Sequence, residues 1–202
     1  FRHRIPFILK DLTKKLVFLV GPRQVGKTWA AKELGKNYRH PVYLNYDSFT
    51  DRKTIQSEGW PAETDFLVLN EIHKLENWKQ FVKGVFDTRP PHLHLLVTGS
   101  ARLETFRHGG DSMAGRFFTH HLMPVTWYEL ACMKEIPAVV SGAPPAAELL
   151  MERGGFPEPL LSPDGLGADR WRRDYIDGLL REDVLDFSKL HDLRSLKLVL
   201  EI

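Results

Sequence analysis

The sequence has few of the features that are typical of secreted proteins, of proteins stabilised by a bound metal or of membrane proteins. Its 202 residues contain one cysteine, Cys132, which cannot form an intrachain disulfide and has no Cys or His neighbours at metal-ligand spacing. We therefore expect a reducing compartment, the cytoplasm. The longest apolar runs, 16–20 and 66–69, are far shorter than the roughly 20 residues that span a bilayer. Neither a membrane helix nor a secretory signal is expected.

An excess of charge of one sign is also missing. The 28 Lys and Arg residues nearly balance the 26 Asp and Glu residues, leaving a formal charge of +2. The chain as a whole therefore lacks the positive field on which sequence-independent nucleic-acid binding depends. Residues 1–15 are locally basic, and we interpret them as an amphipathic helix that precedes the sheet. Contact of this segment with DNA or an acidic partner is the alternative.

Short apolar runs alternate with segments of helical pattern. The predicted strands are 16–20, 42–46, 66–69, 93–98 and about 117–122, and the clearest helices between them are 27–35, 48–58 and 77–86. This alternation predicts an α/β fold in which helices cover a parallel sheet.

The pattern changes after Thr126. A short helix, TWYELACMKE, is followed by the linker-like residues 137–145, a predicted helix at 146–152, the loop GGFPEPLLSPDGLG and a longer helix at about 169–183. We predict a core at 1–136, a linker at 137–145 and a partial all-α lid at 146–202. The chain starts with Phe1 and ends inside the apolar run LKLVLEI, so we expect a fragment of a longer protein.

The strongest motif is GPRQVGKT, which satisfies G-x-x-x-x-G-K-[ST] between a predicted strand and a predicted helix. Its glycines let backbone N–H groups wrap phosphates at a helix N-terminus, its lysine reaches the β- and γ-phosphates, and its threonine hydroxyl binds Mg²⁺. The residues expected to contact the nucleotide are the loop and the residue after it: Gly21, Pro22, Arg23, Gln24, Val25, Gly26, Lys27, Thr28 and Trp29.

A second motif, FLVLNEIHK, is an apolar run that ends in Asn70 and Glu71. We predict that Glu71 activates water and that Asn70 faces the Mg²⁺ site alongside Thr28. An aspartate is usual at the position of Asn70, and an amide keeps its shape without offsetting the charge of the cation. We therefore expect weakened Mg²⁺ binding and slow turnover. The alternative is an incidental Asn-Glu turn at a strand end.

Two further residues are candidates for catalysis. Ser100, in LLVTGS, lies at the expected carboxyl edge of the sheet, where its hydroxyl can report on the γ-phosphate or cap a helix that starts at Ala101. Arg116, in SMAGRFF, is a candidate arginine finger toward the nucleotide of its own chain or of a neighbour in a homo-oligomer. A solvated arginine is the alternative.

In their order, GPRQVGKT, NYD, NEIHKLENW, LLVTGSARL, MAGRF, PVTWYEL, GGFPEP and RDYIDGLLREDV resemble the prokaryotic AAA-like ATPases of the AAA+ superfamily, which usually carry a C-terminal nuclease-like domain of unknown function. The resemblance implies a three-layer P-loop fold with sheet order 5-1-4-3-2, ATP with Mg²⁺, and a helical or winged-helix C-terminal region. It also implies Lys27 and Thr28 as phosphate and Mg²⁺ ligands, Asn70 and Glu71 as the metal-and-base pair, Ser100 as sensor and Arg116 as the family arginine. Asn70 and Trp29 depart from the family pattern.

The function expected from these motifs is an ATP-binding ATPase domain that hydrolyses ATP slowly and acts as a conformational switch for a downstream module. A nucleotide-binding scaffold without hydrolysis is the first alternative. A P-loop kinase for a small molecule is the second, although the acidic balance after Asp164 does not supply the arginine-rich lid that such kinases usually have.

Overall fold

The computed structural model describes residues 4–99, 113, 115–131, 146–162 and 165–179. The chain divides into two compact units, residues 1–132 and 133–202, and each is described by itself. The predicted linker at 137–145 lies outside the described residues. No described helix combines the length and the apolar character needed to cross a membrane.

The first unit is built on a parallel sheet of five strands in the order β2-β3-β4-β1-β5. This is the predicted order 5-1-4-3-2, which is confirmed. Every residue of the two strands β1 and β3 is buried, as expected for strands covered by helices on both faces. The strands are β1 (Leu16–Val20), β2 (Pro41–Asn45), β3 (Phe66–Asn70), β4 (His94–Gly99) and β5 (Phe117–His121).

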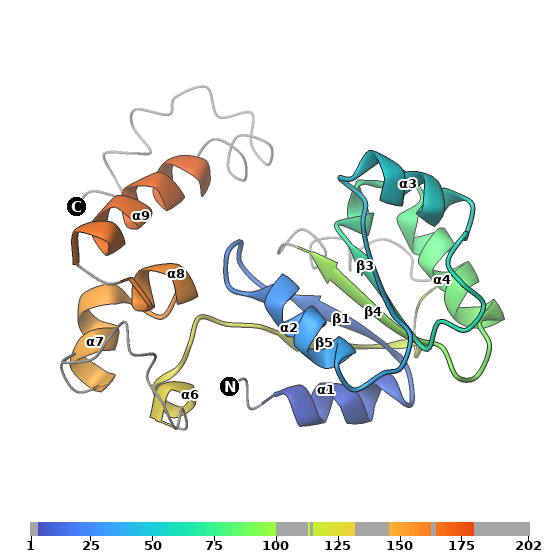
Figure 1. Cartoon of the computed structure of the whole chain (residues 1–202), viewed down its shortest axis with the longest axis horizontal. Helices are drawn as coiled ribbons and strands as arrows, with labels where there is room; N and C mark the ends of the chain where they lie inside the picture. The colour runs from blue at the N-terminus through green and yellow to red at the C-terminus, as the bar shows by residue number, and fades with distance from the viewer. Residues whose placement is uncertain (1–3, 100–112, 114, 132–145, 163–164, 180–202) are drawn as a thin grey trace. The chain divides into compact units, whose positions relative to one another are not determined.

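Helices cover both faces of this sheet (Figure 1). On one face lie α1 (Ile5–Leu12) and α2 (Lys27–Gly35), which contact β1 and β4. On the other lie α3 (Phe49–Gln56), the short 3₁₀ helix η1 (Ile72–Lys74) and α4 (Trp78–Thr88), whose apolar side chains join the main core with alternate residues of the strands. The three-layer α/β sandwich is therefore as predicted.

Local signals explain where several helices begin. The predicted segment 48–58 becomes helical at Phe49 because Ser48 is its N-cap, with Oγ accepting a 3.3 Å hydrogen bond from the Asp51 N–H. The short helix α6 (Trp127–Ala131) follows a reciprocal capping box. The Glu129 N–H donates to Thr126 Oγ1 at 3.2 Å, and the Thr126 N–H donates to Glu129 Oε2 at 3.1 Å.

The outer edge of β2 is closed at both ends. The Tyr46 N–H donates to the Asn70 carbonyl toward β3 at 3.0 Å, so by strand alternation the main chains of Pro41, Tyr43 and Asn45 point outward. Pro41 has no N–H to donate. At the other end, the Asn45 N–H donates to Asp51 Oδ2 and its carbonyl accepts from the Ser48 N–H, both at 2.9 Å. Tyr43 is the middle residue of this outward set.

The second unit contains α7 (Ala146–Arg153), α8 (Pro157–Leu160) and α9 (Gly165–Gly178). Gly154 ends α7 in the left-handed conformation, with φ 76° and an N–H that donates to the Leu150 carbonyl at 2.9 Å. The prediction of a continuous loop through GGFPEP is wrong at 157–160, because Pro157 starts a helix at a position where its missing N–H is not needed. The last helix also begins four residues earlier than predicted.

Three aromatic rings hold this unit together. Trp171 and Tyr175, one turn apart on α9, stack with centroids 4.7 Å apart, and Phe156 lies 5.0 Å from each. Trp171 and Tyr175 are half-buried, and both pack on Phe156 within this unit.

Candidate functional site

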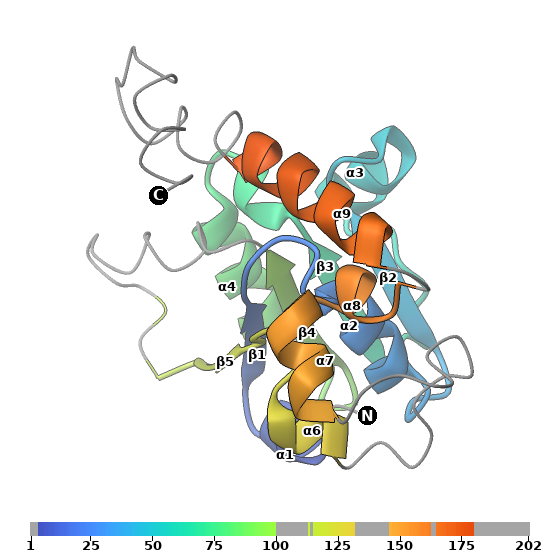
Figure 2. The same ribbon diagram turned by 90° about the vertical axis from the view of Figure 1, so that its left-hand side faces the viewer.

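The carboxyl edge of the sheet gathers most of the predicted site. In the register of the parallel strands, Val20 pairs with Gly99, Asn70 with Thr98, and Asn45 with Asn70. The loop that follows β1 therefore emerges beside the ends of β3 and β4, where ligands bind in open α/β sheets. Figure 2 shows the connection from β1 to α2 as an open arch.

Two glycines determine the shape of this loop. A Cβ on Gly21 would lie 2.2 Å from the Leu122 carbonyl oxygen, so no other residue fits while the Leu122 N–H donates to the Val20 carbonyl at 2.7 Å. Gly26 has φ 95° and is the N-cap of α2, where no side chain caps the helix. The uncapped backbone N–H groups of the first turn of α2 can therefore donate hydrogen bonds to an anion.

Lys27 is buried inside the loop. Its Nζ donates to the carbonyl oxygens of Gly21 at 2.8 Å and of Pro22 at 2.6 Å, and the residue is 9% exposed. Burying an ammonium group is unfavourable unless it is hydrogen-bonded, and the loop supplies these bonds from its own backbone. The next residues, Thr28 and Trp29, are exposed on α2, Trp29 to 43%.

Asn70 is the middle of a hydrogen-bonded chain that crosses neighbouring strands. Thr98 Oγ1 donates to Asn70 Oδ1 at 2.6 Å, and Asn70 Nδ2 donates to Asn45 Oδ1 at 3.1 Å. Asn45 Oδ1 also accepts from the Asp47 N–H at 3.2 Å. The Asn70 amide thus uses one of its two N–H donors and one of the two acceptor lone pairs of its oxygen within the protein, which leaves one lone pair for a metal-bound water.

Glu71 follows in the left-handed conformation, with φ 56°, and its N–H donates to the Thr98 carbonyl at 3.0 Å. Burial raises the pKa of its carboxyl above the usual range, although the cations of Lys74 and Lys27 act in the opposite direction. Its Oε2 lies 3.6 Å from Nε2 of His73. A carboxylate with a raised pKa is the better proton acceptor, as a general base requires.

The sequence reasoning missed Tyr43, which reaches the same site from β2. Its phenol interacts with Thr28, which lowers the pKa of the phenol, and its charged neighbours are Glu71 and Asp51. Burial raises the pKa of this phenol, and both carboxylates raise it further. The signal was present as alternation in the segment VYLN, because Val42 and Leu44 join the core on one face and leave Tyr43 and Asn45 on the face of α2.

Arg116 lies at the opposite edge of the sheet. Its carbonyl accepts from the Leu16 N–H at the start of β1, and its Nε lies 2.8 Å from Asp87 Oδ1 at the end of α4. A five-residue strand, about 16 Å long, separates this position from the loop after Val20. Arg116 therefore lies away from the loop of its own chain, and its role as an arginine finger stays a prediction. Ser100 lies outside the described residues.

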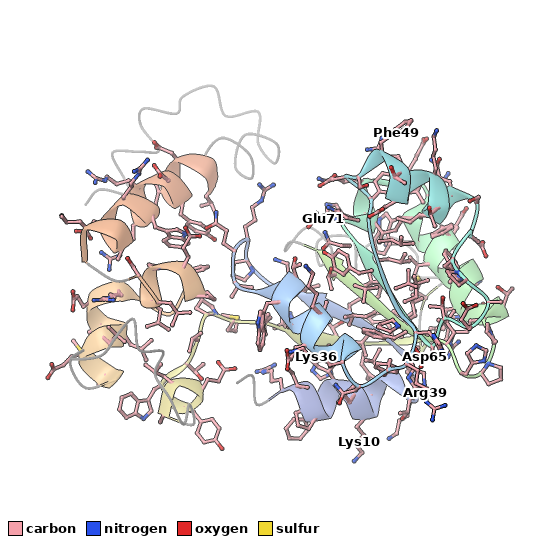
Figure 3. The ribbon with its side chains drawn as sticks, in the orientation of Figure 1. Lys10, Lys36, Arg39, Phe49, Asp65 and Glu71 are labelled. Carbon is pink, nitrogen blue, oxygen red and sulfur yellow. The ribbon has the colours of Figure 1, made fainter. Side chains whose placement is uncertain are left out.

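A separate groove of about 400 Å³ lies beside the C-terminal half of α2. Its floor is apolar and aromatic, with Phe66 and Val68, and its cations are Lys32, Lys36 and Arg39. Figure 3 shows Lys36 and Arg39 at the end of the sheet away from Glu71. The groove therefore lies apart from the loop, and Tyr43 is the site residue that also lines it.

Three comparisons relate this chain to known proteins. A family model described as an AAA domain matches residues 13–131, which is more than half of the chain. An uncharacterized protein of Methanocaldococcus jannaschii, MJ1544, is 22% identical over 96% of this chain. The chain spans about half, 47%, of that curated relative's length. The Walker-type ATPase PABY2304 of Pyrococcus abyssi has the same fold, with a TM-score of 0.60 and 15% identity over 93% of this chain and 75% of that one.

Proposed function

Because the chain belongs to the AAA domain family of P-loop ATPases, we propose that it binds ATP with Mg²⁺, hydrolyses it slowly and serves as a conformational switch for a downstream module. The observation that carries this proposal is the position of Lys27. Its buried ammonium group donates to two carbonyl oxygens of the loop, and Lys27 begins α2, whose first turn has no side-chain cap.

The described residues fit a nucleotide with its metal. The loop offers backbone N–H groups and one buried cation to the phosphates, and Gly21 has no room for any side chain. Thr28 is exposed and interacts with Tyr43, which has Glu71 as a charged neighbour, and hydroxyl and carboxylate oxygens are ligands that Mg²⁺ prefers. Bound Mg²⁺ would offset the charge that develops on the phosphate oxygens.

The residues have separate tasks in hydrolysis. Lys27 and the first turn of α2 hold the phosphates, and Thr28 holds the metal. Glu71 orients a water and accepts its proton, a contribution typically worth 10²- to 10⁴-fold in rate. Asn70 keeps the polar edge of β3 hydrogen-bonded but adds no negative charge, which supports the proposal of slow turnover.

The experiment that tests this function combines thermal unfolding with phosphate release. We expect ATP with Mg²⁺ to raise the unfolding temperature, since a ligand at 100 times its Kd adds about 2.7 kcal/mol. The same nucleotide should leave Lys27→Ala unchanged. Lys36→Ala, which removes a lysine from the far end of α2, is the matched control and should respond like the parent chain (Figure 3).

The outcomes separate the candidate functions. Absence of a thermal shift with ATP, ADP and GTP would contradict nucleotide binding altogether. A shift without phosphate release would favour the non-hydrolysing scaffold. Nucleotide-dependent self-association that Arg116→Ala abolishes would support an arginine finger acting between copies of the chain.

A further inference from the structure

The groove between α2 and β2 has a positively charged rim. Its volume of about 400 Å³ lies within the range of pockets that hold ligands, roughly 300–1,000 Å³. Three cationic side chains line it, those of Lys32, Lys36 and Arg39, and none of the described residues that line it is acidic. The groove therefore favours a negatively charged occupant, although the formal charge of the whole chain is only +2.

The surface beside these cations is apolar and only partly covered by α2. Pro41 is exposed and Tyr43 is half-buried, and both line the groove from β2. A Cβ on Gly35 would lie 3.4 Å from Pro41 and 3.8 Å from the Phe66 ring, so α2 approaches the sheet closely at this residue. Tyr38 stacks on Phe66 with ring centroids 4.5 Å apart and closes the floor. Ring and aliphatic atoms thus form the base of a pocket with a cationic rim.

Two carboxylates lie near Lys36 and Arg39, and both are engaged. Glu33 pairs with Lys36 at 2.6 Å, and the Lys36 side chain is 71% exposed. Asp65 accepts hydrogen bonds from the main-chain N–H groups of Arg39, at 2.8 Å, and of the next residue, at 2.9 Å. An exposed ion pair contributes little to stability, so a carboxylate of a ligand can replace Glu33 at Lys36 without a large loss.

The edge of β2 adds main-chain groups that an extended peptide can recognise. The main chain of Tyr43 points outward, and β2 is the edge strand, so these groups have no strand partner among the described residues. One residue of an antiparallel peptide can exchange both of its main-chain hydrogen bonds with Tyr43. Directly opposite residues place their side chains on the same face of a sheet. The side chain of that peptide residue therefore lies beside the Tyr43 ring, on the side of the groove.

The direction of the peptide determines where its charges belong. In an antiparallel pair, the second residue after the one that pairs with Tyr43 lies opposite Pro41, at the start of β2. Lys36 and Arg39 lie at this end of the sheet (Figure 3). Acidic residues that follow the paired residue thus approach the cations of the rim.

We propose that this groove binds an acidic peptide segment of a partner protein. One apolar residue of the segment pairs with the main chain of Tyr43 and packs on the apolar surface of the groove, and the acidic residues that follow it contact Lys36 and Arg39. The main-chain groups of Tyr43 favour a peptide over a small anion, and the charge of the rim selects against a basic segment. This inference does not rest on the proposed function.

Binding of short peptides to the parent chain tests the inference. The probes are an array of pentapeptides, acetylated at the N-terminus and labelled with a fluorophore at the C-terminus. Each consists of one apolar residue, a serine and three residues drawn from Asp and Glu, and every apolar residue type is represented. A second array has Lys in place of Asp and Glu. Fluorescence polarisation should show binding of members of the acidic array and none of the lysine array.

Charge reversal on the rim locates the binding site. Lys36→Glu and Arg39→Glu should each weaken the acidic peptides about three- to tenfold, because an attractive contact becomes a repulsive one. Lys83→Glu makes the same charge change on α4, on the other face of the sheet, and should leave the affinity unchanged. Two rim variants are used so that a folding defect in one leaves the other to decide.

A methyl group on the backbone nitrogen of the apolar residue tests the pairing with Tyr43. It removes the hydrogen bond to the Tyr43 carbonyl and should weaken binding roughly two- to tenfold, the range of one neutral hydrogen bond. Equal affinities of the methylated and unmethylated peptides would overturn the inference.

The other outcomes also decide. The inference is overturned if no acidic peptide binds, if the lysine array binds equally well, or if Lys36→Glu and Arg39→Glu behave like Lys83→Glu. Binding of single-stranded oligothymidine in place of the acidic peptides would identify a nucleic-acid site and would overturn it as well. None of these measurements requires ATP, so their failure leaves the proposed function untouched.

Discussion

Thr98 Oγ1 donates a 2.6 Å hydrogen bond to Oδ1 of Asn70, across the parallel pair of β4 and β3. Both side chains are buried, and the bond continues through the Asn70 amide to Asn45 on β2. Asn70 therefore differs from an aspartate in more than its charge. Its Nδ2 group donates a hydrogen bond to Asn45, and an aspartate carboxylate could not donate this bond.

This relationship sharpens the expected effect of Asn70→Asp. A carboxylate keeps the bond from Thr98, but Asn45 must turn its amide to donate, which gives up its bond from the Asp47 N–H. We expect faster Mg²⁺-dependent phosphate release at a stability loss of about 1 kcal/mol. Asn77→Asp, at the exposed start of α4, is the charge-matched control and should leave the rate unchanged. Equal rates in the parent chain and in Asn70→Asp would contradict the prediction of charge-limited turnover.

Two glycine substitutions should have opposite effects. Gly21→Ala places a Cβ 2.2 Å from the Leu122 carbonyl, and we expect a loss of about 1–3 kcal/mol in stability together with loss of the ATP-induced thermal shift. Gly84, in the middle of α4, has nothing within 4 Å of a built Cβ. Gly84→Ala should stabilise by about 0.5–1 kcal/mol, because alanine is the better helix former. Chemical denaturation of both variants checks the prediction, which fails if the two changes agree in sign.

Glu71→Gln should separate binding from chemistry. The amide cannot accept the proton of the attacking water, so we expect phosphate release to fall about 10²- to 10⁴-fold while ATP affinity stays close to that of the parent chain. Unchanged turnover would show that Glu71 is not the base.

The pH dependence of turnover gives an independent test of Glu71. Burial raises the pKa of its carboxyl above the usual 4.5, so the group becomes protonated, and loses its function as a base, at a higher pH than an exposed glutamate. The acidic limb of the pH–rate profile should therefore lie above pH 4.5. A profile that stays flat down to that pH would contradict the assignment.

Tyr38 should make stability sensitive to alkaline pH. Burial, and to a smaller extent the negative charge of Asp65, raise the pKa of its phenol from the usual 10.0 to about 12. The folded state therefore holds the phenol proton more tightly than the unfolded state does, so this stability is fully present below pH 10 and is lost as the pH rises toward 12. Tyr38→Phe removes the 2.9 Å bond to His94 Nδ1 and should give a shallower decline over that range in denaturation curves. Parallel declines would contradict this origin.

The sequence allowed the sheet to be predicted because its strands are short apolar runs separated by helices of regular period. The bounds of α2 are those predicted, since Gly26 and Lys27 mark its start within a motif. The geometry of the loop before α2 follows from the same motif residues. Hydrophobic periodicity and motif spacing are local signals, and they are sufficient to predict the strands, α2 and this loop.

The remaining features depend on contacts between distant segments. The partners of Asn70 come from 25 and 28 residues away, and Arg116 meets Asp87 29 residues away, so neither arrangement could be read from spacing. The short helix α8 was missed because Pro157 and Pro159 are turn signals everywhere except in the first turn of a helix. Tyr43 was overlooked because an edge strand carries a weak burial pattern.

The closed outer edge of β2 limits how copies of this chain can associate. Pro41 has no N–H to donate at one end, and Ser48 and Asp51, at the start of α3, bond both main-chain groups of Asn45 at the other. Intermolecular sheets and amyloid-like stacks grow by adding strands to open edges, and this edge offers one residue between two obstructions. Assembly of copies through this edge by strand addition is therefore disfavoured.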